Sequence, residues 1–123
     1  MLEFLSKYFH FLWNKQQIVY QIMIDRFDND SIFPKNNDNG TPPPFRGGNI
    51  KGIINRLDYI TCLGVNSILL SPFFKSNAYH GYHCTTNRNE IEPHFGHEKD
   101  IQSFVKLIKE RRMVCGADFV PNH

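Results

Sequence analysis

The final residues of the chain, ADFVPNH, bring together side chains that could do chemistry. An apolar run ends in the carboxylate of Asp118, and a proline turn then leads to the amide of Asn122 and the imidazole of His123. Because these groups donate and accept hydrogen bonds, together they can hold a polar ligand. We interpret this stretch as the edge of a ligand site.

Histidines give a second pattern. Two pairs, each with members three residues apart, flank a polar segment that also contains a cysteine: His80, His83, His94, His97 and Cys84. Zinc ligands recur at such spacings. A zinc-binding module is therefore an alternative prediction.

Three short apolar segments are typical of buried strands, at residues 17–24, 65–72 and 113–120. Residues 25–48 and 73–97 follow the first two strands and are rich in turn-forming residues, so we predict long loops there. A loop of this length inside a compact domain is commonly functional.

Amphipathic helices are predicted at residues 49–64 and 98–112. Asn49 is placed to cap the first helix, and Gly64 is placed to end it in a left-handed conformation. The second helix begins with acidic residues and ends with basic ones, which matches the helix dipole.

The resulting order, β-α-β-α-β, predicts an α/β fold with parallel strands and right-handed crossovers. Ligands bind such folds at the carboxyl ends of the strands, where both long loops and residues 121–123 would lie. A nucleotide-binding domain begins in the same way, but no glycine-rich phosphate-binding motif follows any of these strands.

The composition of the chain limits which classes of protein it can belong to. The chain has 123 residues, of which 41% are hydrophobic, and this fits one globular domain. Its formal charge of +2 comes without a basic cluster, so we do not expect nucleic acid as a partner, and three cysteines do not indicate a disulfide framework. Residues 1–16 predict an amphipathic lead-in helix. No apolar run is long enough to cross a membrane, so we expect a cytoplasmic protein.

Four ordered segments resemble the α-amylase family, glycoside hydrolase family 13: IVYQIMIDRF, RGGNIKGIINRLDYITCLGVNSILLSPFF, YHGYHCTTNRNEIEPHFG and ADFVPNH. The last contains DFVPNH, which resembles the first signature region of the family. The resemblance implies that residues 17–123 are a partial TIM barrel, the first three strands and two helices of a (β/α)8 catalytic domain. Arg112 departs from the family by standing where the second helix normally ends in glycine.

The resemblance also implies an activity. The family hydrolyses α-glucans such as maltooligosaccharides with retention, which requires two carboxyl groups about 5 Å apart. In the family the nucleophile and the acid/base follow later strands that are absent here, so we expect a truncated chain without catalytic residues that is inactive alone. The alternative is a non-catalytic carbohydrate-binding fragment, or one that associates with a partner through an open sheet edge.

Sugar contacts are implied for four residues. Tyr82 resembles the tyrosine that stacks beneath the sugar at the cleavage point, and His80 and His123 resemble histidines that hydrogen-bond the same sugar. Asp118 resembles an acid that orients an arginine missing here, so we expect its carboxylate to lack that arginine partner.

Calcium is the cofactor that the resemblance implies. Asn122 resembles a calcium ligand of many members, and the Asn/Asp-rich loop resembles a second calcium site of cyclodextrin-acting members. The residues that correspond to this second site are Asn29, Ser31, Asn36, Asn37, Gly47 and Asn49. Ser31 and Asn49 stand where that pattern has aspartates, which predicts a weaker site.

Overall fold

The computed structural model describes residues 16–30, 45–83 and 89–120. The elements are strand β1 (Val19–Ile22), helices α2 (Ile24–Phe27), α3 (Ile50–Asn55) and α4 (Leu57–Cys62), strand β2 (Ser67–Leu70), helix α5 (Glu98–Glu110) and strand β3 (Val114–Ala117). The predicted β-α-β-α-β order is confirmed. Most of the predicted lead-in helix lies outside the described residues. None of the helices in the described ranges is long and apolar enough to span a membrane.

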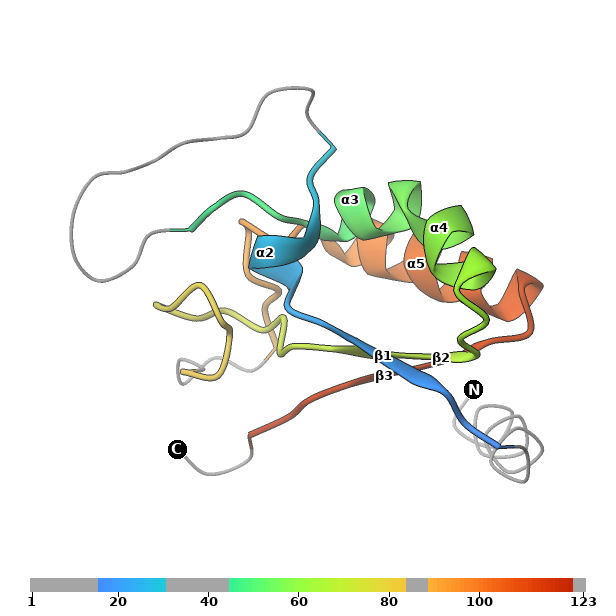
Figure 1. Ribbon diagram of the computed structural model, residues 1–123. Coiled ribbons are helices and arrows are strands. Elements are labelled where there is room, and N and C mark those ends of the chain that lie inside the picture. Colours follow the sequence, from blue (N-terminus) through green and yellow to red (C-terminus); the bar gives the residue numbers. More distant parts are fainter. Residues whose placement is uncertain (1–15, 31–44, 84–88, 121–123) are drawn as a thin grey trace.

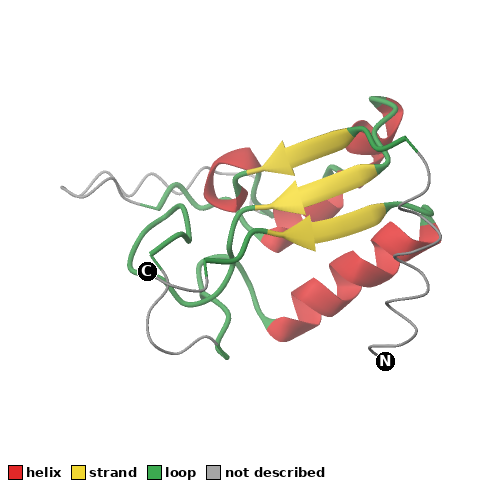
Figure 2. Ribbon diagram, turned by 90° about the horizontal axis from the view of Figure 1, so that it is seen from below, coloured by secondary structure: helices red, strands yellow, loops and turns green. Residues whose placement is uncertain are grey.

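The three strands form one parallel sheet with β2 in the centre. Ile22 pairs with Leu70, and Leu70 pairs with Ala117, so the three strands end at the same level. Figure 2 shows the arrowheads at one edge, with the loop between β2 and α5 gathered beside them. Side chains that follow the strands are therefore brought together at this edge.

Helices α3, α4 and α5 lie along one face of the sheet (Figure 1). The core between these layers is made of buried hydrophobic side chains from every layer: Ile22, Ile24, Ile50, Ile53, Leu57, Ile60, Ile68, Leu70, Phe95, Phe104, Ile108 and Met113. Burial of this apolar surface is the main force that holds the helices on the sheet.

The other face of the sheet differs from the prediction. The apolar strand segments predict strands covered on both faces, but no described helix lies over the second face (Figure 2). Alternation along β1 turns Val19 away from the core residue Ile22. Val19 is consequently 55% exposed, whereas the central strand β2 is largely buried.

Two elements also differ from their predicted bounds. Residues 25–48 are predicted as loop, but the first of them form the single helical turn α2. The predicted helix over residues 49–64 is interrupted at Arg56, where φ of −104° and ψ of 7° separate α3 from α4. The guanidinium of Arg56 hydrogen-bonds Asp28, and this bond holds the pKa of the Asp28 carboxyl below its usual range. The helical spacing of the apolar residues could not reveal this side-chain contact.

The predicted helix ends are confirmed. Asn49 caps α3 by accepting a hydrogen bond from the backbone N–H of Gly52 at 2.8 Å. Gly64 follows α4 with φ of 79°. Arg112 takes the left-handed position after α5, with φ of 55°. A side chain in this conformation is strained where glycine would not be.

Replacing Arg112 by glycine should therefore raise the free energy of unfolding by about 1 kcal/mol, because glycine adopts a positive φ without steric cost. Urea denaturation of both proteins measures the difference. Arg111→Gly is the matched control, since Arg111 has φ of −86° and its guanidinium pairs with Asp58 at 2.9 Å. The control should lose stability. A loss of stability in Arg112→Gly would contradict the prediction.

Candidate functional site

Tyr82 and Asp118 meet at the carboxyl edge of the sheet. Tyr82 lies in the loop after β2, Asp118 directly follows β3, and the Tyr82 hydroxyl donates a hydrogen bond to Asp118 Oδ2 at 2.5 Å. This bond, with partial burial, raises the pKa of the Tyr82 phenol, because ionising it would remove the donor from a carboxylate. The expectation for Asp118 concerned an arginine partner, and in the structure its carboxylate instead accepts the hydrogen bond of the Tyr82 phenol.

His80 packs beside this pair. The backbone N–H of Tyr82 donates to His80 Nδ1 at 3.0 Å, and the centroids of the two rings are 5.8 Å apart. Because Nδ1 accepts, the neutral imidazole carries its proton on Nε2. The structure thus brings His80, Tyr82 and Asp118 together. His123 and Asn122 lie outside the described residues.

An arginine and a further aromatic ring extend this edge toward β1. The guanidinium of Arg26 lies 4.0 Å from the centroid of the Tyr79 ring, and its Nε is 3.0 Å from Asp25 Oδ2. Tyr79 in turn contacts His80 edge to face, with centroids 5.1 Å apart. Contacts therefore run along the carboxyl ends of all three strands, from Asp25 to Asp118.

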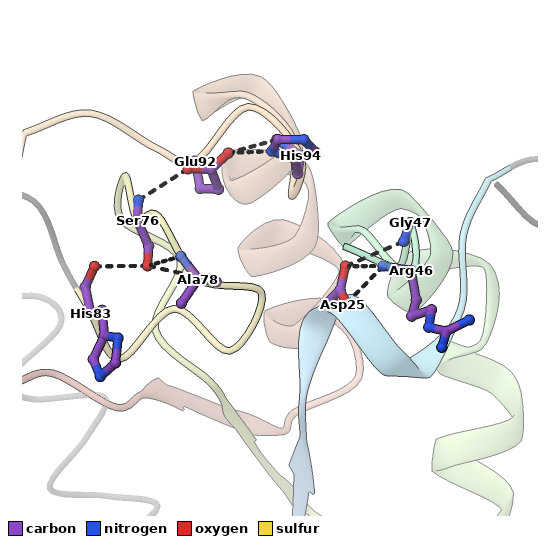
Figure 3. A network of polar contacts seen from close by, with 8 residues as sticks. All are labelled: Asp25, Arg46, Gly47, Ser76, Ala78, His83, Glu92 and His94. Atoms are coloured by element: carbon purple, nitrogen blue, oxygen red, sulfur yellow. Dashed lines mark hydrogen bonds and ion pairs between the residues drawn. The ribbon is translucent and has the colours of Figure 1, made fainter. Parts of the chain in front are cut away.

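Two buried carboxylates anchor the backbone around this edge (Figure 3). Asp25 is 1% exposed and Glu92 is 4% exposed. Asp25 accepts hydrogen bonds from the backbone N–H groups of Arg46 and Gly47, at 2.9–3.2 Å. Sequence reasoning missed both carboxylates as well as Arg26 and Tyr79. A charged pair directly after an apolar strand is the signal that could have found Asp25 and Arg26.

The histidine pairs do not form a metal site in the described part of the chain. His80 and His83 pack edge to face with centroids 4.8 Å apart. His94 stacks on Phe45, with centroids 3.8 Å apart, and its Nδ1 is bonded to Glu92 at 2.5 Å. Among residues 16–30, 45–83 and 89–120, no group of three His, Cys, Asp or Glu side chains is placed to hold a metal ion. Cys84 lies outside these ranges.

One described member of the predicted calcium loop, Asn49, is already hydrogen-bonded within the chain. Asn49 uses Oδ1 to cap α3 and turns its Nδ2 toward Asp30 Oδ1 at 2.8 Å. The ammonium of Lys51 lies 3.9 Å from Asp30 Oδ2. An amide donor and an ammonium therefore already face the carboxylate that a cation would need.

Among the other predicted ligands, Asn29 donates its backbone N–H to Asp28 and Gly47 donates its own to Asp25. Ser31, Asn36 and Asn37 lie outside the described residues.

The described cluster suits binding more than bond cleavage. The rings of Tyr79, His80 and Tyr82 offer flat apolar surface, while the imidazole and carboxylate offer hydrogen-bonding groups. Sugars present both an apolar face and a rim of hydroxyl groups. The two buried carboxylates are occupied with backbone N–H groups and do not form an acid/base pair.

The sequence model of a protein family, described as the catalytic domain of alpha amylase, matches residues 21–123. The chain belongs to the alpha-amylase family. Alpha-amylase 2 of Dictyoglomus thermophilum is 43% identical over 112 residues, which are 91% of this chain and 19% of that protein. A cyclomaltodextrinase of Geobacillus thermopakistaniensis is 37% identical over an alignment of 118 residues, and the match covers 90% of this chain and 20% of that protein. An intracellular maltogenic amylase of Bacillus subtilis is also 37% identical, over an alignment of 119 residues, and the match covers 90% of this chain and 20% of that protein.

Solved structures of alpha-amylases have the same fold. The alpha-amylase of Geobacillus thermoleovorans, determined in complex with acarbose, superposes with a TM-score of 0.76 at 37% identity, over 87% of this chain and 23% of that one. The three-stranded parallel sheet is therefore a partial TIM barrel of the alpha-amylase family, as predicted. The chain spans about a fifth of the length of the curated relatives it matches.

Proposed function

We propose that this chain forms a sugar-binding edge of an α-glucan-acting glycoside hydrolase, with maltooligosaccharides as the ligand class. Tyr82 supplies the ring that covers the apolar face of a glucose unit, and His80 supplies a hydrogen-bond donor to its hydroxyls. Asp118 fixes the Tyr82 ring through its hydroxyl. The observation that carries the proposal is the 2.5 Å hydrogen bond between Tyr82 and Asp118, which joins the loop after β2 to the end of β3.

The relatives support the ligand class. Cyclomaltodextrinase and maltogenic amylase are named for maltose-based glucans, and the Geobacillus thermoleovorans alpha-amylase was solved with acarbose. We infer that the nucleophile and acid/base of a retaining mechanism are supplied by the part of the relatives that this chain does not cover, so that it does not hydrolyse α-glucans alone. His123 is proposed as a further sugar contact. The proposed sugar contacts need no calcium ion.

The test is calorimetric titration of the chain with maltotriose. We expect weak binding of maltotriose, with a Kd of about 1 mM or lower. Tyr82→Ala should raise this Kd about tenfold, because it removes roughly 1.4 kcal/mol of ring contact. Tyr82→Phe keeps the ring and loses only the bond to Asp118, so its loss should be smaller. Tyr59→Ala is the matched control, because Tyr59 is an exposed tyrosine on α4.

Two results would overturn this proposal. One is the absence of maltotriose binding to the unmodified chain up to about 10 mM. The other is equal weakening by Tyr82→Ala and Tyr59→Ala, which would mean that the ring at the sheet edge has no special role.

Two further expectations, about location and association, accompany the proposal. The similarity to an intracellular maltogenic amylase supports a cytoplasmic location, which stays a prediction. Association through the open sheet edge also stays a prediction. Two exposed apolar residues support it: Ile18, which precedes β1, and Val19, the first residue of β1.

A further inference from the structure

Glu92 is a buried carboxylate to which the proposed function gives no role. Its side chain is 5% exposed. Oε2 accepts the backbone N–H of Ser76 at 3.0 Å, and Oε1 accepts the backbone N–H and the ring Nδ1–H of His94 at 3.3 and 2.5 Å. Burial alone would raise the pKa of Glu92, but these hydrogen bonds outweigh it and hold the pKa below its usual range. The carboxylate is therefore ionised at neutral pH.

Ser76 connects Glu92 to the loop that carries the sugar-binding residues, because its backbone bonds to Glu92 and its side chain bonds to that loop. Its hydroxyl donates to the carbonyl oxygen of His83 at 2.8 Å and accepts the backbone N–H of Ala78 at 3.1 Å (Figure 3). The two ends of the segment from 76 to 83 are therefore joined at one side chain. This is the side chain of Ser76, whose backbone N–H is bonded to Glu92.

Inside this closed segment, local contacts fix Tyr82. The backbone N–H of Gly81 donates to the carbonyl of Ala78 at 3.0 Å, and that of Tyr82 donates to His80 Nδ1 at 3.0 Å. The hydroxyl of Tyr82 then reaches Asp118 at 2.5 Å. The placement of the Tyr82 ring thus depends on the base of the loop as well as on its tip.

Charged groups near Glu92 do not replace this anchor. Lys75 neighbours Ser76, but its ammonium pairs with Glu90 at 2.9 Å, and both side chains are about half exposed. His94 is the titratable group bonded directly to Glu92, and it donates to the same carboxylate. Glu92 is the acceptor that binds the Ser76 N–H inside the protein.

We propose that Glu92 is a positioning residue for the sugar site, acting through Ser76 to hold the loop that presents His80 and Tyr82. This inference rests on the proposed function, but it makes a separate claim about where the Tyr82 hydroxyl lies. Without the carboxylate, the buried N–H of Ser76 loses its acceptor, and the loop relaxes away from β3. The bond from Tyr82 to Asp118 then weakens.

The test follows the ionisation of Tyr82 by NMR of isotope-labelled tyrosine, with Tyr82→Phe to assign its signal. In the unmodified chain the phenol pKa lies above the ordinary value. Glu92→Ala and Ser76→Ala should both bring it back to about 10 and weaken maltotriose binding about tenfold. Glu92→Gln retains an oxygen for Ser76 and should restore much of both properties.

Glu90→Ala is the matched control, because this exposed glutamate lies two residues from Glu92 in the same loop. It should behave as the unmodified chain does. An unchanged Tyr82 pKa in Ser76→Ala, or in a folded Glu92→Ala, would overturn the inference, and so would an equal change in Glu90→Ala. If the unmodified chain binds no maltotriose, the proposed function fails, but the Tyr82 titration still decides the role of Glu92.

Discussion

Replacing Asp25 by alanine should lower the free energy of unfolding by about 3–5 kcal/mol. The Asp25 side chain is fully buried, and it accepts the backbone N–H of Arg46 on both oxygens and that of Gly47 on one. Alanine would leave these N–H groups buried without their acceptor, and each such group costs about 1–3 kcal/mol. The guanidinium of Arg26 would lose its partner as well.

Urea denaturation followed by circular dichroism measures this loss. Asp25→Asn keeps one oxygen acceptor but turns an N–H₂ group toward the same backbone donors, so we expect an intermediate loss of about 2–3 kcal/mol. Asp58→Ala is the matched control. The Asp58 side chain is 92% exposed and pairs with Arg111, so its removal should cost less than about 1 kcal/mol. Equal losses in Asp25→Ala and Asp58→Ala would contradict the assigned role of Asp25.

The effect of Asp25 should also extend to the sugar site. Arg26 lies over the ring of Tyr79 while its Nε bonds to Asp25, so the carboxylate fixes the guanidinium on that ring. Tyr79 contacts His80. A residue at the end of β1 is thereby coupled to the loop after β2, which explains why a charged pair follows directly on an apolar strand.

Apart from the short helix α2, the elements of the fold could be predicted from the sequence because each has a local signal. The apolar strands, the amphipathic face of α5, and the caps at Asn49 and Gly64 all depend on residues close together in the chain. The interruption at Arg56 has no such signal, since it accompanies an ion pair with Asp28, 28 positions away. The open face of the sheet also escaped prediction, because apolar strands look alike whether or not a layer covers them.

The candidate site also has parts that the sequence could predict and parts that it could not. Tyr82, His80 and Asp118 were found through the resemblance, because the motif contains the residues themselves. The partner of Asp118 was not found, because a hydrogen bond between residues 36 positions apart depends on the register of β2 and β3. Glu92 was missed for a different reason: a glutamate in a polar segment is usually exposed, and only the folded loop shows that this one is buried.

Replacing Gly81 by alanine should displace the sugar-binding loop and weaken maltotriose binding by at least about tenfold. Gly81 has φ of 76°, and a Cβ atom there would lie 2.0 Å from the carbonyl oxygen of Pro72. An oxygen of the backbone cannot yield as a flexible side chain can, so the loop must move. Because Tyr82 is the next residue, its hydroxyl is drawn away from Asp118.

Gly64→Ala separates this clash from the cost of the backbone conformation. Gly64 has φ of 79°, but its Cβ would meet nothing within 4 Å. Alanine at Gly64 should therefore cost about 1 kcal/mol of stability and leave maltotriose binding unchanged. Alanine at Gly81 carries the same conformational cost plus the overlap with Pro72, so it should lose more stability in urea and also lose the raised pKa of Tyr82. Equal stability in the two variants, with the Tyr82 pKa retained in both, would show that the loop tip accommodates a side chain and that its approach to Pro72 does not position Tyr82.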